Sequence, residues 1–240
     1  MATPRQIRDI FTPVLAEYPD LVMHRRWIIK PPVGLAIIGL HIGQTAYASR
    51  SDLALSVVAL SRFMLPKAPG YQRYLHVSRN LSEISTGVHP HTLGDAAPDI
   101  CHDMFSPDYK AYLPANFATK VRPFFDSVRS FDDVRLWISD FRNLPQRQGA
   151  PETIDSWIAA MHGDFSTAAE LMHRLLDRLG PARDGPAGDQ RRFEHEIHRI
   201  LRTGNRAAIA AFLHDLERRT IAAHGLERYW QPAPFPFERE

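Results

Sequence analysis

The sequence lacks the features that most quickly assign a chain to a functional class. It has a single cysteine, Cys101, so no internal disulfide can form, which is compatible with a reducing compartment. The longest apolar run, residues 33–42, falls far short of the ~20 residues of a membrane-spanning helix. The N-terminal segment MATPRQIRDIF carries charges where a secretory signal needs an apolar core. We therefore expect a cytoplasmic protein with no membrane partner.

An excess of charge of one sign is also missing. The chain has 29 Lys and Arg against 27 Asp and Glu, a formal net charge of +2. Such a balance gives no broad basic field to attract nucleic acid, which is therefore not the expected partner. The hydrophobic content of 44% is ordinary for a globular protein, and 240 residues supply an ample core for one large domain or two small ones.

The common catalytic motifs are absent as well. There is no Gly-x-Ser-x-Gly nucleophile turn, no phosphate-binding glycine loop and no dinucleotide fingerprint. Cys101 precedes His102, but side chains of adjacent residues rarely point at one another, so an idle cysteine is the simpler interpretation. The sequence predicts no catalytic residue and no cofactor.

What the chain does contain is a set of apolar, β-branched runs between Leu21 and Leu65. Breaker clusters, PPVG and SRSD, divide this stretch into three runs. Residues of one parity are apolar in each run, which is the two-residue period of a half-buried strand. These residues are Leu21, Met23, Trp27 and Ile29 in the first run, with Arg25 as the exception; Ala36, Ile38, Leu40 and Ile42 in the second; and Leu53, Leu55, Val57 and Ala59 in the third. The pattern predicts an antiparallel meander, with a weaker fourth strand near Val77.

Helical patterns flank the meander on both sides. Thr3 and Pro4 predict the start of a first helix, which Pro13 is expected to kink or shorten. Successive helices are predicted over residues 106–128, 130–141, 151–161 and 164–179, and two more follow a Gly- and Pro-rich segment. The expected fold class is α+β: an antiparallel β-meander of three to four strands covered by helices, followed by a helical C-terminal half.

Four segments describe the expected domain organisation. Residues 1–105 hold the first helix, the meander and a long loop, and residues 106–179 form a helical segment packed on it. Residues 180–190 are a flexible linker, and residues 191–240 form a helical hairpin with an extended tail whose aromatic rings anchor it. All four segments are compatible with one domain.

The order of these elements resembles a bacterial family of unknown function. The resemblance covers residues 5–175 and depends on the arginine-containing turn YLHVSRNLSEI and the segment VRPFFDSVRSFDDVRLWI, with its Pro123-Phe124-Phe125 element. Related proteins occur among immunity proteins of interbacterial toxin systems. The resemblance therefore implies binding rather than catalysis, and it transfers no functional residues.

The long loop between residues 85 and 106 holds the candidate site residues. His89 and His91 have the His-x-His spacing that metal sites use, and together with His102 they are the candidate metal ligands. Solvated histidines are the simpler interpretation, because Pro90 separates the first two and no longer spacing rule is met. The nearby acidic residues are the candidate partner-binding residues: Asp95, Asp99 and Asp103.

Three functions remain open on the sequence alone. A protein-binding module, such as an immunity protein that neutralises a toxin, is the leading hypothesis, with the acidic loop steering toward a basic partner. A metal-dependent hydrolase built on the loop from His89 to Asp103 is the alternative. A nucleic-acid-binding protein ranks third and would use Arg25 and Arg26 with the later arginines Arg191, Arg192, Arg199, Arg202 and Arg206.

Overall fold

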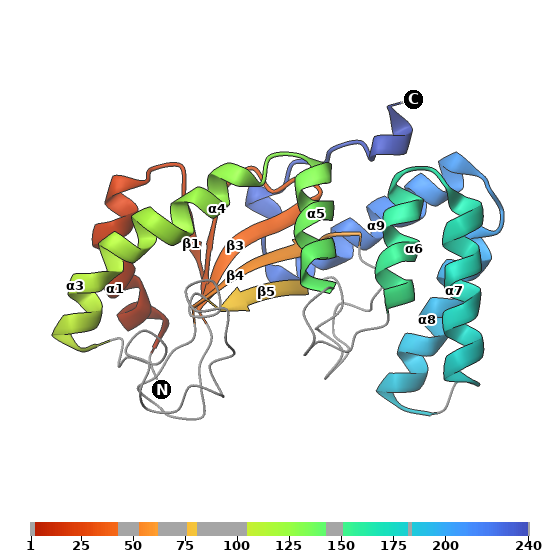
Figure 1. Ribbon diagram of the computed structural model, residues 1–240, viewed down its shortest axis with the longest axis horizontal. Coiled ribbons are helices and arrows are strands. Elements are labelled where there is room, and N and C mark those ends of the chain that lie inside the picture. The colour runs from red at the N-terminus through yellow and green to blue at the C-terminus, as the bar shows by residue number, and fades with distance from the viewer. Residues whose placement is uncertain are drawn as a thin grey trace. The chain divides into compact units, whose positions relative to one another are not determined.

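The structure is a computed structural model that describes residues 3–42, 53–61, 76–80, 105–142, 151–181 and 184–239. The sheet strands are β1 (Val22–His24), β2 (Trp27–Ile29), β3 (Ala36–Ile42), β4 (Leu53–Ala59) and β5 (His76–Asn80). Before them lies helix α1 (Pro4–Glu17), and after them come α3 (Pro107–Asn116), η3 (Phe117–Val121), α4 (Arg122–Ser127), α5 (Phe131–Arg142), α6 (Pro151–Met161), α7 (Phe165–Leu179), α8 (Pro186–Leu201), α9 (Arg206–His224), η4 (Glu227–Tyr229) and η5 (Pro236–Glu238). Figure 1 shows these elements along the chain and confirms the predicted α+β class with its helical C-terminal half.

The strands lie in the sheet in chain order, β1-β2-β3-β4-β5, as a meander requires. β1 and β2 pair antiparallel, with His24 opposite Trp27, so the chain reverses in the two residues between them. Arg25 takes a positive φ of 55° in this turn, which two-residue hairpin loops require. The prediction of one continuous strand across this run is therefore wrong, because Arg25, the residue that broke the parity, is in the turn.

The two central strands are buried on both faces. Ile37 and Leu40 are both fully buried although they have opposite parity, and Val57 and Val58 are buried side by side in β4. The predicted burial of Leu40 and Val57 is confirmed, but the predicted half-buried strand is wrong. Continuous apolar runs are typical of strands covered on both faces.

The chain divides into two compact units, and each is described by itself. The first contains Met1–Pro32, Ile37–Val57 and Ser78–Arg129, and the second contains Val33–Ala36, Val58–Val77 and Ser130–Glu240. The boundary in the helical half thus falls between α4 and α5.

In the first unit, α1 starts where the sequence predicts. The Thr3 hydroxyl accepts a hydrogen bond from the Gln6 backbone amide, and Oε1 of the Gln6 side chain accepts one from the Thr3 backbone amide, which completes a capping box. Pro13 does not shorten the helix, which continues to Glu17. The apolar face buries Ile7, Ile10, Phe11 and Val14.

The predicted helix over residues 106–128 is segmented at its prolines. α3 begins after Ser106, whose hydroxyl caps the Tyr109 amide, and Pro114 is followed by the π-helical turn η3. A proline lacks the amide hydrogen of the regular ladder, and a wider turn accommodates that loss. Figure 1 shows α3, η3 and α4 as one nearly continuous rod.

Ion pairs join three parts of the first unit. Arg122 of α4 donates to Asp20 at 2.7 Å and to Asp126 at 2.8 Å, and Lys30 lies 3.6 and 3.4 Å from the same two carboxylates. Hydrogen bonds from Arg122 are the main cause that lowers the pKa of both aspartates. Two acids and two bases balance in this group, which fixes the turn after α1 and the end of β2 to α4.

The second unit is a row of helices in which α5 packs on α6, α6 on α7, α7 on α8 and α8 on α9. The turn between α6 and α7 uses Gly163 at a positive φ of 79°, and Asp164 caps α7 by accepting from the Thr167 amide. α8 begins at Pro186, inside the segment 180–190 that the sequence indicates as a linker. No helix in the described part of the chain is long and apolar enough to cross a membrane.

The C-terminal tail lies against its unit as predicted, fixed by aromatic rings. Phe235 and Phe237 are fully buried, and Phe237 meets the ring of Phe165 edge to face at 5.2 Å. Trp230 forms a parallel bridge with Val33. The tail is not wholly extended, because it contains the short turns η4 and η5.

Candidate functional site

The candidate metal ligands and partner-binding residues lie outside the described residues. This holds for His89, His91 and His102 and for Asp95, Asp99 and Asp103, so both assignments stay predictions. Among the residues that the structure does describe, no group of three His, Cys, Asp or Glu side chains is arranged to hold a metal ion.

Several of the arginines assigned to a nucleic-acid surface have internal partners instead. Arg191 donates to the Gly180 carbonyl and pairs with Glu194 at 3.1 Å, and Arg192 pairs with Asp189 at 2.5 Å. Arg206 donates to the backbone carbonyl of Phe237. The helical periodicity could not reveal all of these contacts, because two of the four partners, Gly180 and Phe237, lie at the end of α7 and in the tail.

A polar cluster on α9, which the sequence analysis missed, is the strongest candidate site. Helical spacing places His214, Glu217 and Thr220 along one stripe of α9. Glu217 is fully buried, because the same stripe continues into the buried Leu213 and Ile221. The sequence does contain a signal for this burial, because Glu217 lies four residues after the inward-facing Leu213 on the same helix. An acidic residue within a run of charged residues is normally assigned to the solvent-exposed face, so this signal was missed.

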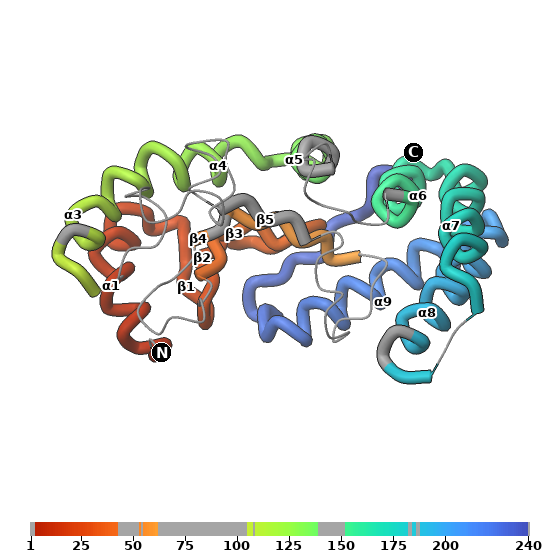
Figure 2. The backbone as a smooth tube through the Cα atoms, turned by 60° about the horizontal axis from the view of Figure 1, so that its bottom comes forward, coloured from red at the N-terminus to blue at the C-terminus, as the bar shows by residue number. Residues whose placement is uncertain are grey.

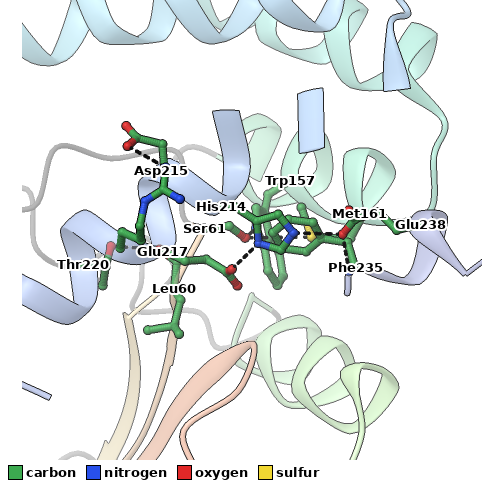
Figure 3. Close-up of polar contacts among 11 residues, drawn as sticks. Leu60, Ser61, Trp157, Met161, His214, Asp215, Glu217, Thr220, Phe235 and Glu238 are labelled. Atoms are coloured by element: carbon green, nitrogen blue, oxygen red, sulfur yellow. Dashed lines mark hydrogen bonds and ion pairs between the residues drawn. The ribbon is translucent and has the colours of Figure 1, made fainter. Parts of the chain in front are cut away.

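His214 joins two carboxylates through its two ring nitrogens. Nδ1 lies 2.7 Å from Oε2 of Glu217, and Nε2 lies 3.1 Å from Oε2 of Glu238 in the tail. Figure 3 shows the imidazole ring between these two side chains. We call Glu217, His214 and Glu238 the Glu-His-Glu cluster.

The aromatic tail completes the surroundings of this cluster. Phe235 stacks on the imidazole at 4.4 Å between ring centroids, and its amide donates to Oε2 of Glu238 at 2.7 Å. Beside the cluster, Thr220 donates to the Leu60 carbonyl at 2.8 Å, which fixes α9 to the end of β4. Figure 3 also shows the neighbouring bond from the Trp157 indole to the Ser61 hydroxyl.

The electrostatics of Glu217 are unusual. Burial raises its pKa to about 7, against the opposing effect of the hydrogen bond with His214. Its second oxygen, Oε1, is buried without a hydrogen-bond partner among the described residues. A buried carboxyl whose pKa lies near neutral pH, in contact with an imidazole, can act as a proton donor or as a pH-sensitive contact.

A second group of titratable residues lies on the exposed surface where α7 and α8 meet. The rings of His173 and His198 stack at 5.5 Å, and Arg199 and Arg202 are exposed on α8. Partial burial, followed by the nearby charges of His173 and Arg202, lowers the pKa of His198. We call His173, His195, His198, Arg199 and Arg202 the α7–α8 face.

Comparison with known proteins found no match: no protein-family model fits the sequence, and no curated protein or solved structure is significantly similar to it.

Proposed function

We propose that this chain acts by binding another protein, as an immunity protein that neutralises a bacterial toxin does. The observation that carries the proposal is the row of helices α6 to α9, each packed on the next. Helices stacked in this way bury a continuous seam between neighbours and leave long outer faces, which repeat proteins use for partner binding. Figure 2 shows α7 and α8 side by side within this row.

The α7–α8 face is the part of this row best suited to contact a partner. Stacking of His173 on His198 brings the exposed surfaces of the two helices together. Arg199 and Arg202 are exposed and have no ion pair within the described residues. Arg174 and Arg178 on α7, by contrast, pair with Glu170 and Glu152. Cations without internal partners steer an acidic protein surface toward this face.

The internal partners of the other arginines favour protein over nucleic acid. Binding along a nucleic-acid backbone needs several cations free to replace counterions. Arg191, Arg192 and Arg206 are engaged inside the second unit, which leaves few for such a role. A protein interface needs only a complementary patch of about 800 Å² on each partner.

The test is the association of the full chain with the product of its neighbouring gene. We expect a 1:1 complex whose association rate falls as salt rises. Changing Arg199 and Arg202 to Ser should slow association and reduce its salt dependence. The matched control changes Arg192 and Arg218 to Ser, because these arginines pair with Asp189 and Asp215 and their loss alters the net charge equally.

A second set of variants tests whether the partner binds the α7–α8 face or the acidic loop predicted by the sequence. If Asp95, Asp99 and Asp103 contact a basic partner, their joint change to Ser slows association while the Arg199 and Arg202 variant binds normally. Absence of any complex, together with one equivalent of bound metal and a hydrolytic activity lost on His89→Ala or His91→Ala, would overturn the proposal in favour of an enzyme.

A further inference from the structure

The C-terminal segment 226–239, which we call the C-terminal strap, is attached to its unit by contacts of three kinds. Main-chain hydrogen bonds connect it to Val33, whose amide donates to the Tyr229 carbonyl at 2.8 Å and whose carbonyl accepts from the Gln231 amide at 2.9 Å. The buried rings of Phe235 and Phe237 stack on each other at 5.7 Å. The polar contact is the ion pair of Glu238 with His214.

Of these contacts, the one between Glu238 and His214 is the one that requires a titratable proton. Each of the two short contacts of His214 joins a ring nitrogen to a carboxylate oxygen, so each requires a proton between its atoms. Two protons are therefore held among Glu217, His214 and Glu238. Loss of either proton would leave a nitrogen lone pair facing a carboxylate oxygen at hydrogen-bond distance.

The cluster needs fewer protons when the strap is away. One of the two shared protons is the N–H that a neutral imidazole always keeps, and this proton alone satisfies the contact between Nδ1 and Glu217. Detachment therefore allows the cluster to release up to one proton. By linkage, higher pH favours the detached strap, by up to about tenfold in its opening equilibrium per pH unit.

The charged groups around the cluster do not replace these protons. The pKa of Glu217 responds to His214 from its own helix and to Glu238 from the strap. Leu60, the residue after β4, supplies a neutral carbonyl to Thr220. Arg206 reaches the strap through the Phe237 carbonyl, while Arg218 and Arg219 pair with Asp215.

We propose that the C-terminal strap is a pH-sensitive latch, closed while Glu217, His214 and Glu238 share two protons and loosened as rising pH removes one of them. Loosening uncovers Phe235 and Phe237 together with the start of α7, where Phe165 meets Phe237. Access to this end of the helical row then depends on pH. The inference is independent of the proposed binding function.

Hydrogen exchange of the full chain at about pH 6, 7 and 8, corrected for the intrinsic rate at each pH, tests the latch. The reporters are the amides of Gln231, Phe235 and Glu238, which all donate within the strap or to Val33. We expect their opening equilibrium to rise with pH, by at most about tenfold per pH unit, while amides of α7 keep constant protection. Unchanged protection of the strap across this range would overturn the proposal.

Changing either glutamate to glutamine replaces the titrating carboxyl with an amide, which donates a hydrogen bond at any pH. In Glu217→Gln the amide donates to Nδ1 and leaves the Nε2 proton for Glu238, so the strap should stay closed at pH 8. Glu238→Gln should act in the same way from the exposed side, with its amide donating to Nε2, and it provides the answer if the buried variant does not fold. A wild-type pH slope in both variants would contradict the mechanism.

The matched control is Glu194→Gln. Glu194 is also buried, and burial raises its pKa, but it pairs with Gln190 and Arg191 on α8 and does not touch the strap. Its variant should keep the pH slope of the wild-type strap. If Glu194→Gln also reduced the pH dependence of strap opening, that dependence would reflect the overall stability of the protein, and the latch proposal would be overturned.

Discussion

At the scale of single residues, the burial of Glu217 has a consequence for stability. Its folded-state pKa of about 7 lies above the ordinary value of 4.5, so the folded protein binds more protons than the unfolded chain between these values. The associated stability is fully present below pH 4.5 and is lost as pH rises through 7. A shift of this size corresponds to about 3 kcal/mol at most.

We therefore predict that Glu217→Gln removes this pH dependence. Denaturant unfolding at about pH 5 and pH 7.5 should show a decline for the wild-type chain and a much smaller one for the variant. His173→Gln, a change at an exposed histidine, should retain the wild-type decline. Equal declines in wild type and Glu217→Gln would show that Glu217 does not titrate in this range.

Gly39 in β3 is required by close packing within the sheet. A Cβ at this position would lie 2.8 Å from the Ile28 carbonyl oxygen and 2.9 Å from the Trp27 ring. We predict that Gly39→Ala destabilises the fold by roughly 1–3 kcal/mol, measured by denaturant unfolding. Gly34→Ala is the control, because its added Cβ meets no atom within 4 Å among the described residues, apart from its own chain neighbours. An unchanged free energy of unfolding in Gly39→Ala would mean that β2 can shift to make room for the added methyl group.

The residues of the Glu-His-Glu cluster show where sequence reasoning ends. The i, i+3 spacing of His214 and Glu217 is visible in the sequence, but their role depends on Glu238, which is 24 residues beyond His214. No periodicity predicts where a proline-rich tail returns. Burial of an acid is also invisible to a hydrophobic pattern, because the pattern assigns acids to solvent.

At the scale of elements, the sequence correctly predicted where several helices begin, because helix starts depend on the capping residue and its immediate neighbours. The capping residues Thr3, Ser106 and Asp164 lie where α1, α3 and α7 begin. The strand pattern was less informative, because a strand buried on both faces has no alternation to detect. The hairpin at Arg25 was missed since arginine is not a typical residue for a positive φ.

Burial of both faces of β3 gives a test that separates it from a half-buried strand. Leu40→Asp and Ile37→Asp should each place an unpaired charge in the core and destabilise by roughly 3 kcal/mol or more. Leu136→Asp is the control, because Leu136 is 52% exposed on α5. A normal melting temperature for Ile37→Asp alone would restore the alternating pattern predicted from the sequence.

The C-terminal strap should stabilise the chain as an element. Deletion of residues 226–240 removes the buried Phe235 and Phe237 and uncovers Phe165, so we predict a melting temperature lower by several degrees. Deletion of residues 239–240 alone should have little effect, because Arg239 is exposed. An unshifted melt for the longer deletion would show that the strap contributes no packing energy.

At the scale of the whole molecule, the chain comprises two compact units with different characters. In the first, strands and α1 are secured by the ion pairs of Arg122 and Lys30. The second is a row of helices that carries the exposed α7–α8 face and, at one end, the C-terminal strap. The proposed binding function belongs to the second unit, and contact through the acidic loop remains a separate prediction for residues outside the described part of the chain.

The most direct test of the binding hypothesis is a calorimetric titration of the full chain with the product of the neighbouring gene, at low and at physiological salt. We expect a saturable 1:1 complex of at least micromolar affinity that is weakened by salt and by the joint change of Arg199 and Arg202 to Ser. No heat of binding at either salt concentration, with a metal-dependent hydrolytic activity in the purified chain, would contradict the binding hypothesis.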